Sequence, residues 1–207
     1  MDRDYEALPI RELGAGAGFR RPTQPQTPKV STESPALEVM TDLARATPAT
    51  IRAQAPLAGA NQFMITRGVR LLLVVDDHEN VLGVITASDI LGERPMLVAA
   101  ERGMRRDELT VADIMIAAAQ VEVIAFADVL AARVGHVLET LRRAGRQHAL
   151  VVDFDEIPSA RPLAPPGRRA MVRGIFSLSQ IARQLGVSVA TGGEVARTFS
   201  EIGAAIK

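Results

Sequence analysis

The stretch VLGVITASDI, Val81–Ile90, returns later in the chain as VRGIFSLSQI, Val172–Ile181. Each copy reads as an apolar strand that contains a glycine, followed by a Ser/Thr-containing turn and the start of a helix. The aspartate of the first copy, Asp89, is replaced by Gln180 in the second. Because one strand-turn-helix unit occurs twice, the repeat predicts two related halves with different chemistry at their turns.

The residues before each repeated stretch also correspond. In the first half, a helical pattern over 56–67 ends at Gly68, and VRLLLVVDD reads as a buried strand that pairs with VLGVIT. In the second half, a pattern over 134–144 ends at Gly145, and RQHALVVD reads as the strand that pairs with VRGIFS. We therefore expect helix, strand, strand and helix in the same order in both halves.

The second half is longer than the first between its two strands. The additional residues form a Pro- and Arg-rich segment near 155–171. Proline cannot donate to a sheet ladder, so we expect a hairpin loop whose prolines and arginines lie outside both strands. The loop should be dispensable for folding.

Composition excludes several classes of function. The chain has 207 residues and 47% hydrophobic residues, enough to bury a core, and it has no cysteine for a disulfide or a thiolate nucleophile. Its three histidines, His78, His136 and His148, lack the close spacing of a metal site. Lys+Arg and Asp+Glu number 24 each, so nucleic acid is not an expected partner.

Motifs of catalysis and membrane insertion are also missing from the sequence. It contains no nucleophile elbow, no Walker loop and no HExxH, so we do not expect an enzyme. The apolar runs are too short to cross a bilayer, and the N-terminus lacks the features of a secretory signal. We expect a soluble, cytoplasmic protein.

The repeated unit and the segment ELTVADIM before its second copy resemble a tandem pair of CBS domains, also called a Bateman module. The resemblance extends from about Ala46 to Gly186. It implies an α/β (α+β) fold in which two β-α-β-β-α units pack about a pseudo-twofold axis and leave two clefts between them. It also implies dimerisation.

The Gly- and Pro-rich N-terminus predicts a tail, and the spacing of Leu37, Met40 and Leu43 predicts a short helix after it. The resemblance adds the two domains that follow. We expect a flexible tail over 1–34, a leading helix over 35–46, a first CBS domain over 47–109, a second over 110–190 that carries the insertion, and a C-terminal helix over 191–207.

The turn Thr86-Ala87-Ser88-Asp89 is the strongest candidate for a binding site. Free N–H groups at a helix start and the Thr86 hydroxyl favour a phosphate, and the Asp89 carboxylate could accept hydrogen bonds from both hydroxyls of a ribose. In CBS domains the matching residues bind phosphate or ribose, and the resemblance carries these roles to Thr86 and Asp89. The alternative is that the two residues only cap the helix.

The second turn departs from this pattern. Ser177 keeps a hydroxyl, but the neutral amide of Gln180 accepts hydrogen bonds more weakly than a carboxylate, so this cleft should hold a nucleotide poorly. Arg70, His148 and Arg173 are candidates to neutralise phosphates. The residues expected to bind ligand are Thr86, Asp89, Ser88, Thr50, Ile51, Arg70, Leu71, Ser177, Gln180 and His148, of which Thr50, Ile51 and Leu71, with Val69, would line an adenine slot by resemblance.

These features predict a regulatory function without catalysis. We expect a homodimer that requires no cofactor, binds an adenosine-containing ligand (AMP, ATP or S-adenosylmethionine) between the two units, and signals to a partner protein in trans. The alternative is a structural or interaction protein whose clefts have lost ligand binding, which the Gln180 substitution favours.

Overall fold

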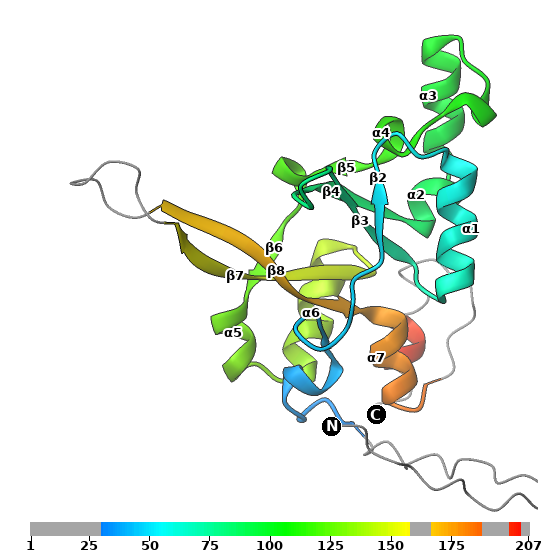
Figure 1. Ribbon diagram of the computed structural model, residues 1–207. Helices are drawn as coiled ribbons and strands as arrows, with labels where there is room; N and C mark the ends of the chain where they lie inside the picture. The colour runs from blue at the N-terminus through cyan, green and yellow to red at the C-terminus, as the bar shows by residue number, and fades with distance from the viewer. Residues whose placement is uncertain (1–29, 158–166, 188–198, 204–207) are drawn as a thin grey trace, which may run out of the picture.

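The computed structural model describes residues 30–157, 167–187 and 199–203. Two four-stranded sheets organise this part of the chain, with strand orders β2-β3-β4-β5 and β1-β8-β7-β6 (Figure 1). Each sheet belongs mainly to one half of the sequence, which confirms the predicted mixed α/β fold with two units.

The first unit follows the predicted order of elements. It contains β2 (Thr50–Arg52), α1 (Leu57–Arg67), β3 (Leu71–Val75), β4 (Val81–Thr86) and α2 (Ala87–Leu91). Helix α1 buries Leu57, Ala60 and Met64, which recur on one face, and ends at Gly68 in the left-handed conformation, with φ 65°. All five residues of β3 are buried, as expected for a strand covered on both faces.

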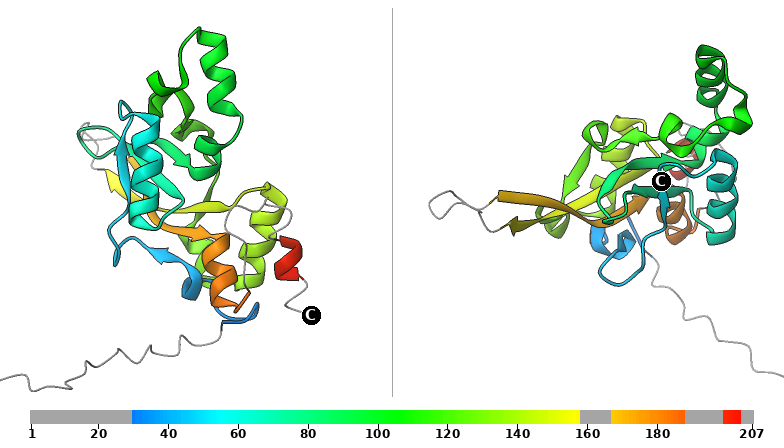
Figure 2. Two further views of the ribbon diagram at one scale, coloured as in Figure 1. Left: turned by 90° about the vertical axis from the view of Figure 1, so that its right-hand side faces the viewer. Right: turned by 45° about the horizontal axis from the view of Figure 1, so that its top comes forward.

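A connecting region joins the two units. It contains α3 (Arg94–Arg102), a 3₁₀ turn η2 (Arg106–Glu108), α4 (Val111–Ile114), β5 (Ile116–Ala117) and a second 3₁₀ turn η3 (Ala118–Gln120). Figures 1 and 2 show α3, in green, standing at the outer end of the first unit.

The second unit repeats the first with one additional helix. It contains β6 (Val123–Ala125), α5 (Phe126–Ala131), α6 (Val134–Ala144), β7 (His148–Ile157), β8 (Gly167–Ser177) and α7 (Leu178–Gln184). Helix α6 ends at Gly145 with φ 63°, as predicted. The hairpins β3–β4 and β7–β8 even share a bulge, since the register shifts between Val74 and Val75 and between Val151 and Val152.

Each unit lends a strand to the sheet of the other. Strand β1 (Thr41–Asp42), which precedes the first unit, pairs with β8 of the second unit, with Thr41 opposite Ile175. Strand β5, which precedes the second unit, pairs with β4 of the first, with Ile116 opposite Val84. This reciprocal exchange gives the two halves their pseudo-twofold relation.

The predicted leading helix over 35–46 is wrong. Only Ala36–Val39 form a helical turn, of the 3₁₀ type (η1), and Met40 is already extended. The spacing of apolar residues suggested a longer helix, but pairing with β8 satisfies the backbone of Thr41 and Asp42 instead. Tertiary hydrogen bonding therefore outweighs a weak local preference.

The N-terminal tail ends earlier than the predicted residue 34. Val30 is buried in the core of the second unit, and the Thr32 carbonyl accepts a hydrogen bond from the Gly135 N–H at the start of α6. Residues 1–29 of the predicted tail lie outside the described residues. At the other end of the chain, residues 199–203 are helical and Ile202 is buried, while the rest of the predicted C-terminal helix is not described.

The insertion is partly sheet. Strands β7 and β8 continue beyond the core as a two-stranded ribbon whose register runs to Ile157 opposite Gly167, and Figure 1 shows this ribbon projecting from the second unit. The prediction that the arginines lie outside the strands is wrong for Arg168 and Arg169, which belong to β8. Arg169 donates a hydrogen bond to Asn80, in the turn of the first hairpin. Residues 158–166 of the predicted loop lie outside the described residues.

Within the described ranges, no helix is long and apolar enough to cross a membrane.

The repeated glycines, Gly83 and Gly174, lie opposite the exchanged strands β5 and β1. Substitutions at these glycines test how closely the exchanged strands must approach. A Cβ atom at Gly83 would lie 2.2 Å from the Ile116 carbonyl oxygen, whereas a Cβ at Gly174 would meet the flexible Met40 side chain. We expect Gly83→Ala to lower the free energy of unfolding by about 2 kcal/mol or more, and Gly174→Ala to lower it less, because a side chain relaxes more easily than a backbone. Urea denaturation of both variants measures the difference, and a larger loss for Gly174→Ala would contradict the proposed role of the Gly83 contact.

Candidate functional site

Two clefts lie where the units meet. The larger, here called the Gln180 cleft, has a volume of about 960 Å³ and is bounded by residues 47–49, by residues 67–71 after α1, and by the turn from β8 to α7. The smaller, here called the Asp89 cleft, has a volume of about 190 Å³ and lies beside the turn from β4 to α2. Small-molecule sites commonly occupy roughly 300–1,000 Å³, so the larger cleft has the size of such a site and the smaller does not.

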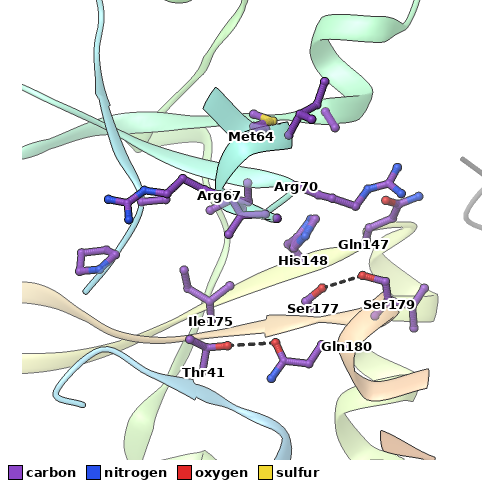
Figure 3. A pocket seen from close by; sticks show the side chains of 18 of the residues that line it. Thr41, Met64, Arg67, Arg70, Gln147, His148, Ile175, Ser177, Ser179 and Gln180 are labelled. Atoms are coloured by element: carbon purple, nitrogen blue, oxygen red, sulfur yellow. Dashed lines mark hydrogen bonds between the residues drawn. The ribbon is translucent and has the colours of Figure 1, made fainter. Parts of the chain in front are cut away.

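Polar groups from both units face the Gln180 cleft. Figure 3 shows Arg67 and Arg70 of the first unit across from Ser177, Ser179 and Gln180 of the second. Apolar surface is supplied by Val69, Leu71 and Ile175, among others. A ligand here would contact both units at once.

The charged groups of the Gln180 cleft are of one sign. Arg67, Arg70 and Arg183 line it, and among the described lining residues none is Asp or Glu. The Nε atom of Arg70 is buried and has no hydrogen-bond partner among the described residues. Burying a charged donor without an acceptor is costly, so this atom indicates a place for an anionic group.

Gln180 is held by the exchanged strand. The Thr41 hydroxyl of β1 donates a hydrogen bond to Gln180 Oε1 over 3.1 Å, which fixes the side chain at the cleft (Figure 3). The hydroxyls of Ser177 and Ser179 lie 3.1 Å apart at the start of α7.

His148 lines both clefts. It stands at the start of β7 opposite Ser177, at the position that Leu71 takes opposite Thr86 in the first unit. Burial, and then the nearby Arg70 guanidinium, lower the pKa of His148 to about 4. The side chain is therefore neutral at pH 7 and does not neutralise a phosphate as a cation in the unliganded protein.

In the Asp89 cleft, the predicted ligand residues form a helix cap. Asp89 Oδ2 accepts hydrogen bonds from the Thr86 N–H over 2.8 Å and from the Thr86 hydroxyl over 2.7 Å. The Thr86 hydroxyl in turn accepts from the Asp89 N–H. This is a capping box, which satisfies the free donors of the first turn of α2.

The same capping box occurs again away from both clefts. Asp113 Oδ2 accepts from the Thr110 N–H over 2.8 Å and from the Thr110 hydroxyl over 2.7 Å at the start of α4. Neither residue lines a cleft. Because the same geometry arises outside both clefts, helix capping is sufficient to explain the conformation of Asp89.

The Asp89 cleft also differs in charge. Its lining includes two carboxylates, those of Asp89 and Glu122, and Glu122 pairs with Arg146 over 3.6 Å. An anionic ligand would meet less favourable electrostatics here than in the Gln180 cleft.

The predicted site residues thus separate into three groups. Arg70, Leu71, His148, Ser177 and Gln180 line the Gln180 cleft. Thr86, Ser88 and Asp89, again with Leu71 and His148, line the Asp89 cleft.

Two predicted residues and one predicted cation line neither cleft. Thr50 and Ile51 lie in β2, and the wall is made instead by the preceding residues 47–49. Arg173 forms an ion pair with Asp42 and lies over the Phe126 ring, 4.9 Å from its centroid.

Many residues of the larger cleft were not predicted from the sequence, among them one segment and three polar residues. These are Thr47–Ala49, Asn61, Arg67 and Arg183. Arg67 and Arg183 lie in the last turns of α1 and α7. Basic residues are common there because they interact favourably with the helix dipole, so the sequence pattern offered no reason to assign these two to a binding site.

The neutral state of His148 predicts a pH dependence of stability. An unfolded histidine takes up its proton near pH 6.5, whereas His148 in the fold does so near pH 4. Between these values the unfolded chain binds more protons, so the free energy of unfolding should fall as the pH drops from about 6.5 to about 4. His148→Leu, which copies Leu71 of the first unit, should remove this part of the slope, and His78→Gln at an exposed turn should not. Urea denaturation between pH 4.5 and 7 tests this, and an unchanged slope in His148→Leu would refute it.

Comparisons with known proteins agree with the repeated architecture. Residues 36–95 match the family model of the CBS domain. Among solved structures, an uncharacterized conserved protein from Pyrococcus horikoshii is 20% identical, with a TM-score of 0.50 over 79% of this chain and 100% of that chain.

Two further solved structures overlap less closely. The CBS domain pair of protein MJ0100 in complex with 5′-methylthioadenosine and S-adenosyl-L-methionine is 20% identical, with a TM-score of 0.44 over 71% of this chain and 97% of that chain. CBSX2 in complex with AMP, a protein of Arabidopsis thaliana, is 16% identical, with a TM-score of 0.46 over 72% and 94%. A comparison with curated proteins finds no match. Residues 36–95 thus match the CBS-domain model, and the second half of the chain repeats the strands, turn and helix of the first, with the leading strands exchanged.

Proposed function

We propose that the protein is a non-catalytic regulatory module that binds an adenosine-containing ligand, such as AMP, ATP or S-adenosylmethionine, and signals to a partner protein in trans. The observation that carries this proposal is the Gln180 cleft, which has the volume of a small-molecule site and walls from both units. The volume favours this cleft over the Asp89 cleft, to which the sequence pointed.

The lining of the Gln180 cleft matches the parts of such a ligand. Val69, Leu71 and Ile175 offer apolar surface to a base, and the Ser177 hydroxyl offers hydrogen bonds to a ribose. Arg70 offers a charged donor to a phosphate. In this arrangement the base, sugar and phosphate would be held by both units together.

The exchanged strand provides a route for a signal. A ligand that engages the Gln180 amide binds a side chain that also accepts a hydrogen bond from Thr41, and Thr41 belongs to β1, the strand that the first half lends to the second sheet. Ligand binding would then shift the docking of β1, provided that the ligand binds one arrangement more tightly than the other.

A thermal-shift panel on the full chain tests the ligand class. With AMP, ADP, ATP and S-adenosylmethionine at about 100 times the dissociation constant, a true ligand should stabilise the fold by about 2.7 kcal/mol. Ser179→Trp, which fills the Gln180 cleft, should abolish this effect. Asp89→Asn should preserve it, since Asn still caps a helix.

The opposite pattern of effects would assign the ligand to the Asp89 cleft instead of the Gln180 cleft. If Asp89→Asn abolishes the shift and Ser179→Trp does not, the ligand occupies the Asp89 cleft, as the sequence suggested. If no adenosine compound shifts the melting temperature of the wild type, the alternative of a structural or interaction protein is supported instead.

The outer end of the first unit supports the expected homodimer. Leu91, Met96 and Leu97 on the adjacent helices α2 and α3 are exposed by 64%, 61% and 64%. Clusters of this kind commonly mark an interface. We expect light scattering to give a dimer mass for the wild type and a monomer mass for Leu97→Glu, while a wild-type monomer over a wide concentration range would refute the dimer.

A further inference from the structure

We infer that the Gln180 cleft prefers ligands with a polyphosphate chain, which are nucleoside diphosphates and triphosphates. It binds nucleoside monophosphates and cationic sulfonium nucleosides more weakly. This inference rests on the proposed function. The inference follows from the charge of the cleft, from the state of Arg70 and from the orientation of the Gln180 amide.

Three arginines from different segments line this cleft, whose described lining contains no carboxylate. Arg67 ends α1, Arg70 precedes β3, and Arg183 lies in the last turn of α7. None of them forms an ion pair with another described residue, whereas Arg102, for example, pairs with Asp113. Arg67 and Arg183 are exposed and Arg70 is half-buried, so Arg70 provides the least screened attraction and the other two add to it for each further negative charge of a ligand.

Arg70 has an unused donor within the cleft wall. Its Nε atom is buried and unpaired among the described residues, while its carbonyl accepts from the Ala87 N–H at the start of α2. The backbone of Arg70 is thus fixed and its guanidinium lacks an acceptor. A guanidinium binds phosphate through parallel hydrogen bonds, so a phosphate oxygen would satisfy Nε.

The substitution at 180 changes an acceptor into a donor. The Thr41 hydroxyl donates to Gln180 Oε1 and occupies one of its two acceptor sites, while both Nε2 hydrogens remain as donors for a ligand. A carboxylate at this position, as at Asp89 in the other unit, would accept from ribose hydroxyls but repel phosphate. Gln180 therefore suits an anionic group better than a sugar, and its presence need not mean that the cleft has lost its ligand.

The same charges disfavour a sulfonium ligand. S-adenosylmethionine places a positive charge beside the ribose, where the described lining supplies cations and no carboxylate. AMP carries about two negative charges at neutral pH and ATP about four, so attraction to the cleft should rise along the series from AMP to ATP.

Calorimetric titration of the full chain with adenosine, AMP, ADP, ATP, S-adenosylmethionine and inorganic tripolyphosphate tests this order. We expect ATP to bind at least about tenfold more tightly than AMP, S-adenosylmethionine to bind more weakly than AMP, and the ATP affinity to fall with added salt. AMP or S-adenosylmethionine binding as tightly as ATP would overturn the inference and leave the proposed function intact. Binding of tripolyphosphate without any adenosine compound would overturn the proposed function and leave the polyphosphate site.

Variants of the cleft give the second test. Arg70→Gln and Gln180→Asp should each weaken ATP binding by about tenfold or more and weaken adenosine binding much less. Arg183→Gln, at an exposed position, provides a further variant with the same expectation. Arg94→Gln, exposed on α3 outside both cleft linings, is the control and should bind ATP like the wild type.

Gln180→Asp distinguishes the two interpretations of this position, because they predict opposite changes in ATP affinity. Because the aspartate is one methylene shorter and can lose the hydrogen bond from Thr41, the unliganded melting temperature is measured beside the affinity. If Gln180 marks a degraded ribose site, the aspartate restores ligand affinity. If it marks a polyphosphate site, the aspartate reduces the affinity for ATP, and a rise in ATP affinity would refute the inference.

Discussion

The backbone hydrogen bonds of two short exchanged strands, together with the apolar cluster of Leu73, Val84 and Leu150 between the sheets, join the two units. Strand β1 joins the sheet of the second unit and β5 joins that of the first, each by only a few residue pairs. Gly83 and Gly174 leave space for this close approach. Because of the exchange, the two sheets cannot separate without breaking ladder hydrogen bonds, and the clefts between the units keep walls from both.

Local sequence signals predicted most of the secondary structure. Gly68 and Gly145 end their helices in the left-handed conformation, and the apolar runs before and after them form the expected strands. These signals depend on neighbouring residues alone, so one sequence is enough to read them. The prediction of a leading helix was wrong because Thr41 pairs with β8, which lies far along the chain, and such a long-range pairing leaves no local pattern in the sequence.

The candidate site likewise combines a turn that the sequence made recognisable with features that arise only in the folded chain. The turn at Thr86 and Asp89 was recognisable, yet its geometry is a capping box that recurs at Thr110 and Asp113, so a local motif could not separate a cap from a ligand group. The volumes of the two clefts depend on how the units pack, which the sequence does not encode in any short stretch. The cationic character of the larger cleft likewise arises from arginines of separate elements that become neighbours only in the fold.

The exchange also imposes an order on the synthesis of the chain. Thr41 leaves the ribosome early, but Gln180, to which it donates, follows 139 positions later. The first unit, by contrast, receives β5 soon after β4, so its sheet can close while the second unit is still being made. Strand β1 must therefore remain undocked until β8 has been made, and the larger cleft becomes complete only after α7 has followed it.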